Sequence, residues 1–217
     1  MKYSKMSKQT RRRFLSGALP ITLGAVFGPA GSVASENAKA KLSDTKIKVL
    51  VVGAHPDDPE TTCGGTMALF ANAGHEVVSA YLTRGEAGIE GKSYDESASI
   101  RTAEAHAACS ILKVRAEFLE QIDGSCEINR GRYAEMIDFL KKEEPDIIIT
   151  HWPIDTHRDH RICSILVYDA WLATGRKASL YYCEAMSGMQ SQNFKPDTYI
   201  DITRVIAFRS WLHNNTR

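Results

Sequence analysis

The chain has 217 residues, 43% hydrophobic and 24% charged, proportions that are typical of one globular domain and exclude a disordered, collagen-like or coiled-coil chain. Residues 1–34 contain six of the 27 Lys and Arg and none of the 26 Asp and Glu, so the rest of the chain holds 21 basic and 26 acidic groups, a net charge of −5. A surface of this sign does not favour a polyanion, so we expect no nucleic-acid partner.

Residues 1–34 have the order of an export signal. A basic stretch ends at Arg13, an apolar stretch runs to Ala30, and small residues follow up to Ala34. The apolar stretch is too short, and too rich in Gly and Pro, for a stable membrane anchor. The run Thr10-Arg11-Arg12-Arg13-Phe14-Leu15 resembles a twin-arginine signal. We expect cleavage after Ala34 and export by the twin-arginine machinery of a bacterium to the periplasm or beyond; a basic disordered tail is the alternative.

After a polar linker at 35–46, apolar β-branched runs alternate with segments of helical periodicity. In chain order, this pattern predicts a strand at 47–53, a helix at 59–73, a strand at 76–83, a helix at 95–113, a short strand at 117–119, a helix at 129–144, a strand at 146–150, a helix at 160–174, and strands at 179–183 and 199–202. Such alternation predicts an α/β domain over 47–217, with an open, mostly parallel sheet covered by helices on both faces.

Periodicity also predicts which helix faces are buried. In the helix at 95–113 the expected apolar face comprises Ile100, Ala103, Ala107 and Ile111; in the helix at 129–144 it comprises Tyr133, Met136, Ile137 and Leu140. The five cysteines form no Cys-x-x-Cys pair, and most lie in apolar segments. We therefore expect free thiols that act as small core residues.

Two polar clusters follow strands of the predicted sheet. His55, Asp57 and Asp58 come after the first strand, and His157, Asp159 and His160 come after the strand at 146–150. Because the carboxyl ends of parallel strands share one edge of a sheet, the clusters can meet there. Two imidazoles and a carboxylate form the ligand set of a catalytic zinc site, and a spare carboxylate can accept a proton from water. Each residue alone would more often be a cap or a hydrogen-bonding side chain, but the two clusters together favour a metal site.

Several motifs resemble those of the PIG-L (LmbE-like) deacetylase family over roughly residues 47–205. They are Ala54-His55-Pro56-Asp57-Asp58, Cys63-Gly64-Gly65-Thr66, Leu82-Thr83-Arg84-Gly85-Glu86-Ala87-Gly88, Arg101 with Glu104, His157-Arg158-Asp159-His160, and Tyr199-Ile200-Asp201-Ile202-Thr203. The resemblance implies a Rossmann-like sheet and zinc-dependent hydrolysis of an N-acetyl group on a small glucosamine-type sugar or conjugate. Fe²⁺ or Co²⁺ would fit the same ligands.

The resemblance also implies a role for individual residues. The metal ligands fall on His55, Asp58 and His160, the general base on Asp57, and the group that stabilises the oxyanion or protonates the leaving amine on His157. The remaining roles are an orienting carboxylate for His157 at Asp159 and substrate contacts at Arg84 and Glu86.

Two departures from the family pattern stand out. Pro59 follows the paired aspartates, where an acidic residue is commoner. The family's usual helix with a His and a Ser-Gln pair after the final strand has no counterpart, which implies a shortened C-terminus and an open pocket wall.

Two alternative functions remain open: a zinc amidase for larger amide conjugates, and a non-catalytic relative that binds a metal and a sugar. The missing G-x-G-x-x-G and P-loop motifs disfavour a nucleotide-binding protein, and the oligomeric state stays open, a homo-oligomer included.

Overall fold

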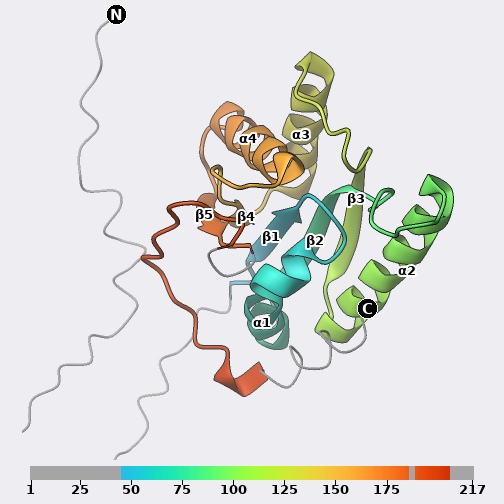
Figure 1. Ribbon diagram of the computed structural model, residues 1–217. Coiled ribbons are helices and arrows are strands. Elements are labelled where there is room, and N and C mark those ends of the chain that lie inside the picture. The colour runs from blue at the N-terminus through green and yellow to red at the C-terminus, as the bar shows by residue number, and fades with distance from the viewer. Residues whose placement is uncertain (1–44, 186–188, 206–217) are drawn as a thin grey trace, which may run out of the picture. The chain divides into compact units, whose positions relative to one another are not determined.

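The computed structural model describes residues 45–185 and 189–205, in which helices and strands alternate (Figure 1). The elements are β1 (Lys48–Gly53), α1 (Asp58–Asn72), β2 (Glu76–Thr83), α2 (Tyr94–Leu112), β3 (Arg115–Gln121), α3 (Arg130–Glu143), β4 (Ile147–His151), α4 (Arg158–Ala173), β5 (Ser179–Cys183) and the 3-10 helix η2 (Thr203–Val205). The expected signal at 1–34 and the linker up to residue 44 lie outside the described residues. Within the described part, no helix is both long and apolar enough to cross a bilayer.

The five strands form one parallel sheet in the order β3-β2-β1-β4-β5. From β1 the chain adds β2 and β3 on one side, and then returns to place β4 and β5 on the other side of β1. The direction of winding therefore reverses between β1 and β4, which is where open α/β sheets form a crevice at their carboxyl edge. This arrangement confirms the predicted α/β class and the parallel sheet.

Helices cover both faces of the sheet, as predicted (Figure 1). Alternate residues of β1 separate the two layers because successive side chains of a strand point to opposite faces. Leu50 and Val52 pack with residues of α3 and α4, whereas Val49 and Val51 pack with residues of α1 and α2. The continuous apolar sequence of β1 is thus explained by burial on both sides.

The boundaries of most elements agree with the sequence prediction to within two residues, and all five cysteines are free thiols, as expected. The predicted stripe of α3 is confirmed: Met136 and Leu140 are buried, with Tyr133 and Ile137 packed against the same cluster.

Two predictions about faces and strands are wrong. The buried face of α2 comprises Ala98, Ala105, Ala108, Cys109 and Leu112, while the expected Ile100, Ala103 and Ala107 are exposed. The helix packs through small side chains, which allow a close approach to the sheet but give a weak hydrophobic signal. Residues 199–202 form no strand; Ile202 instead packs on α1, where a Cβ at Gly65 would lie 2.7 Å from its Cδ1 atom.

Candidate active site

The turn after β1 brings His55 and Asp58 together. Gly53 permits this turn because a Cβ there would lie 2.7 Å from the Cβ of Asp58. His55 Nδ1 lies 3.2 Å from Asp58 Oδ2, and the same oxygen accepts hydrogen bonds from the backbone N–H groups of Ala54 at 3.1 Å and His55 at 2.8 Å. The carboxylate of Asp58, the first residue of α1, is therefore held by the backbone of the turn that precedes this helix.

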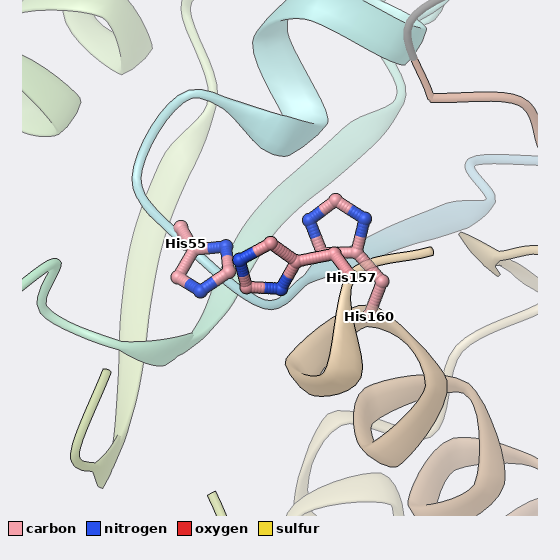
Figure 2. Close-up of side chains that lie close together, drawn as sticks. All are labelled: His55, His157 and His160. Carbon is pink, nitrogen blue, oxygen red and sulfur yellow. The ribbon is translucent and has the colours of Figure 1, made fainter. Parts of the chain in front are cut away.

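The start of α4 supplies two further histidines. His157 is the N-cap of α4, and its Nδ1 accepts a hydrogen bond from the backbone N–H of Asp159 at 3.3 Å. His160 lies in the first turn, with Nε2 3.3 Å from Asp58 Oδ1 and Nδ1 3.4 Å from Asp155 Oδ2. Figure 2 shows the rings of His55, His157 and His160 side by side, with the centroids of His55 and His157 4.7 Å apart. The two sequence clusters thus meet at the edge shared by β1 and β4, as the strand order requires.

Asp58 lies close to both of the histidines that are expected to share a metal with it. Asp58 lies 3.2 Å from a nitrogen of His55 and 3.3 Å from a nitrogen of His160, whereas charge-assisted hydrogen bonds are usually about 2.7–2.9 Å long. Ligand atoms about 2.0–2.1 Å from a tetrahedral zinc are about 3.3 Å from one another. Each Asp58–histidine pair therefore has the spacing of two zinc ligands, but His55, Asp58 and His160 are not one of the trios whose ligand atoms all converge, so their joint role stays a prediction.

The charge around His55 also favours a cation. Besides Asp58, the carboxylates of Asp123 and Asp159 lie 3.1 Å and 3.5 Å from His55 Nε2. Burial alone would lower the pKa of His55, but the hydrogen bonds to Asp123, Asp159 and Asp58 outweigh it and raise this pKa to about 12. Three carboxylates around one imidazole favour positive charge at this point, which either the protonated ring or a bound divalent ion can supply.

Sequence reasoning missed His151, the last residue of β4. Its side chain is 1% exposed, and its Nε2 lies 3.2 Å from Asp58 Oδ2 and accepts a hydrogen bond from the backbone N–H of Ala54 at 3.0 Å. Its ring stacks on His160 at 3.9 Å. Three trios of described side chains converge closely enough to hold a metal: Asp58, His151 and His160; His55, His157 and His160; and His55, Asp123 and Asp159. His151 has no second candidate ligand at a characteristic spacing in the sequence, so the sequence alone gives no signal for its role.

Asp57, the expected base, points into the pocket beside these ligands. Its backbone has a φ of 105°, and its carboxylate accepts a hydrogen bond from Arg101 Nη2 at 2.7 Å. Arg101 also donates to the carbonyl of Pro56, so one guanidinium holds both residues of the turn. Burial and the neighbouring charge of Asp58 raise the pKa of Asp57, although Arg101 acts to lower it. A raised pKa suits a carboxylate that accepts a proton near neutral pH.

The contacts of Asp159 differ from those expected. Its carboxylate accepts a hydrogen bond from the backbone N–H of Gly124 at 2.7 Å and faces His55, while only its backbone N–H contacts His157. Burial acts to raise the pKa of Asp159, but the bonds from His55 and Gly124 lower it to about 2. Asp159 therefore orients His157 through its main chain and His55 through its side chain.

Arg84 and Glu86 are not among the residues that line the pocket. Glu86 is 3% exposed, and its carboxylate accepts hydrogen bonds from Arg84 Nε at 3.3 Å and from the backbone N–H of Asp123 at 3.1 Å. The pair fastens the loop after β2 to the loop after β3. Their expected role in substrate binding stays a prediction. Asp123, which sequence reasoning also missed, is positioned by this contact and reaches His55.

These residues surround a pocket of about 980 Å³, a volume that admits a small molecule. Its wall comprises His55, Asp57, Asp58, Thr61, Thr62, Gly85, Ala87, Gly88, Arg101, Asp123, Gly124, His157, His160, Glu184, Ala185 and Gln190. The arrangement has room for a cation, a water molecule and a carbonyl group next to the carboxylate of Asp57.

Comparison with known proteins places the same region in one family. Residues 50–171 match the family described as PIG-L, GlcNAc-PI de-N-acetylase. The chain is 28% identical over 175 residues to the 4-oxalmesaconate hydratase of Pseudomonas putida, covering 72% of this chain and 67% of that protein. It is 27% identical over 144 residues to the 1D-myo-inositol 2-acetamido-2-deoxy-alpha-D-glucopyranoside deacetylase of Corynebacterium diphtheriae, covering 52% of this chain and 48%, about half, of that protein. The crystal structure of GalB, the 4-carboxy-2-hydroxymuconate hydratase of Pseudomonas putida KT2440, has a TM-score of 0.69 and 26% identity over 78% of each chain.

Proposed function

The chain belongs to the PIG-L family, and we propose that it is a metal-dependent hydrolase that removes the acetyl group from an N-acetylglucosamine-type sugar or conjugate and releases acetate. The observation that carries this proposal is the contact of Asp58 with both His55 and His160, next to a separate carboxylate, Asp57, in the same pocket. One set of residues can thus hold a cation while another handles the proton of a water molecule.

His55, Asp58 and His160 would hold a Zn²⁺ or similar ion, which when bound polarises a carbonyl and lowers the pKa of water. Asp57 then accepts a proton from the attacking water, whose oxygen forms a bond to the carbonyl carbon of the acetamide. His157 lies near enough to His55 and His160 to donate a hydrogen bond to the oxyanion that develops. When the C–N bond breaks, the departing amine takes a proton from Asp57 or His157, leaving acetate and a free amino sugar.

A second candidate is the addition of water to a carbon–carbon double bond. The likeness to a Pseudomonas putida hydratase, in sequence and in structure, favours it, because the match to 4-oxalmesaconate hydratase covers more of this chain than the match to the deacetylase does. Both reactions need an activated water molecule and a proton acceptor. They differ in the charge of the substrate: a carboxymuconate is a polycarboxylate, whereas an acetylated sugar is uncharged.

One assay distinguishes these functions. The purified full chain is analysed for bound metal and assayed for acetate release from N-acetylglucosamine and its conjugates, for cleavage of larger amides, and for the absorbance loss that follows hydration of a conjugated carboxymuconate. We expect about one zinc per chain and acetate release that a chelator abolishes. Hydration without acetate release would favour the second candidate, and cleavage of the larger amides alone would identify a different amidase. A folded chain that binds sugar and metal but turns over none of these substrates would be a binding relative.

A further inference from the structure

Glu184 is a half-buried carboxylate in the wall of the pocket, directly after the end of β5. The other carboxylates of the wall have cationic partners: Asp57 pairs with Arg101, and Asp58 and Asp123 each contact His55. Across residues 45–185 and 189–205, the side chain of Glu184 has neither a hydrogen bond nor an ion pair. Its charge is therefore free to act on whatever occupies the pocket.

The backbone beside Glu184 is fixed to the candidate metal site. The N–H of Ala185 donates a hydrogen bond to Ser191 Oγ at 2.9 Å, and Ser191 donates to Asp155 Oδ2 at 3.4 Å. Asp155 in turn lies beside His160. These contacts hold the backbone next to Glu184 relative to the candidate ligands, and Glu184 lines the same pocket as they do.

Among the described residues, the wall has no Lys or Arg that is free to bind an anionic substrate. Arg101 is the only Lys or Arg among the described residues that line the pocket, and its two terminal nitrogens contact Asp57 at 2.7 Å and Glu104 at 3.2 Å. Carboxylates and phosphates are usually recognised by a free guanidinium or ammonium group. A divalent ion would offset only two of the charges of Asp58, Asp123, Asp159 and Glu184, so the surroundings of the substrate stay negative.

We propose that Glu184 determines specificity: it accepts hydrogen bonds from the hydroxyl groups of an uncharged sugar and repels substrates that carry a carboxylate or a phosphate. This inference rests on the proposed function and deepens it, because it states which member of the substrate class the pocket admits. It also means that the polycarboxylates named for the hydratase relatives fit this pocket poorly.

The test compares two sugars that differ in one remote charge. For the zinc-loaded full chain, dissociation constants by calorimetry and kcat/KM by acetate release are measured for methyl N-acetylglucosaminide and for N-acetylglucosamine 1-phosphate. We expect the wild-type chain to bind and turn over the phosphate on the order of tenfold less well, as for like charges several ångströms apart in a partly hydrated site. Glu184→Gln, which keeps the shape of the side chain, should remove most of this difference through KM and the dissociation constant.

Glu144→Gln is the matched control, because Glu144 is an exposed glutamate at the end of α3, outside the pocket wall, and its loss changes the net charge equally. It should leave the preference between the two sugars unchanged. Equal affinity of the wild-type chain for both sugars, or an unchanged ratio in Glu184→Gln, would overturn the inference even if acetate is released. Conversely, a ratio that depends on Glu184 in the binding data, without acetate release, would sink the proposed reaction and leave the role of Glu184 standing.

Discussion

The backbone of Asp57 has a conformation that residues other than glycine rarely adopt. A φ of 105° lies in the left-handed region, which costs a non-glycine residue about 1–3 kcal/mol and often marks functional sites. Two hydrogen bonds from Arg101, one to Asp57 and one to Pro56, offset this cost. The strained turn directs the Asp57 carboxylate into the pocket while Asp58 faces the histidines.

Replacing Asp57 by Asn tests whether its carboxylate accepts the proton. Asn tolerates a left-handed backbone and keeps the side-chain shape, so the turn and the ligands should persist. We expect kcat for acetate release to fall by about 10²–10⁴-fold, the usual contribution of a general base, with zinc content unchanged by atomic spectroscopy. Asp138→Asn, an exposed position on α3, should be neutral. Wild-type turnover in the Asp57 variant would contradict the assignment.

At the residue scale, a site residue can be predicted from the sequence when it stands at a characteristic spacing from a second site residue. His55 and Asp58, and likewise His157 and His160, are separated by three positions at the ends of adjacent strands, so their convergence could be predicted. His151 and Asp123 each stand alone in the sequence. They reach the site because β4 ends beside Ala54 and because Glu86 binds the backbone of Asp123, contacts that depend on the tertiary structure.

At the scale of elements, the segment before η2 packs closely against α1. Gly65 allows Ile202 to pack directly on the helix, because a Cβ would lie 2.7–2.9 Å from three side-chain atoms of Ile202. Replacing a helical Gly by Ala ordinarily stabilises a protein by about 1 kcal/mol. Here overpacking, which costs about 1–3 kcal/mol, should outweigh that gain.

Gly65→Ala is therefore expected to lower the free energy of unfolding by about 1 kcal/mol, measured by urea denaturation. In a background carrying Ile202→Ala, the same substitution meets no obstacle and should stabilise the chain relative to Ile202→Ala alone. This change of sign between the two backgrounds is the diagnostic result. If Gly65→Ala stabilises both to the same extent, Ile202 does not pack on α1 as described.

The same segment shows where prediction from periodicity fails. Strands β2 and β5 have the predicted boundaries because their β-branched and aromatic runs are long enough to specify a strand. The run at 199–202 has a similar composition, but its apolar residue is used to cover Gly65 rather than to extend the sheet. For α2, two faces with helical spacing were available, and small residues on one of them allowed closer packing against the sheet.

At the scale of the whole domain, the strand order determines where charge can accumulate. Because winding reverses between β1 and β4, the loops after these strands are not covered by a crossover helix, and polar side chains from both can meet without entering the core. The structure gathers Asp58, Asp123 and Asp159 around His55 at this point. Their mutual repulsion is offset by positive charge, which the protonated ring of His55 or a bound cation can supply.

A bound divalent ion should consequently stabilise the folded domain. A ligand that binds the native state at a concentration 100 times its dissociation constant adds about 2.7 kcal/mol of stability, which corresponds to an increase of roughly 5–10 °C in Tm for a domain of this size. Scanning calorimetry of the chelator-treated chain, with and without added Zn²⁺, measures this shift. Mg²⁺, which prefers an octahedral oxygen shell, should give a much smaller one.

His160→Ala provides the control for this whole-domain effect. The variant keeps the carboxylates around His55 but removes one of the three imidazoles that contact Asp58. Its Tm should therefore change little when Zn²⁺ is added, and its zinc content should fall below that of the wild-type chain. A wild-type Tm that is insensitive to Zn²⁺, or an equal zinc-dependent shift in the variant, would show that the cluster does not bind the ion through these residues.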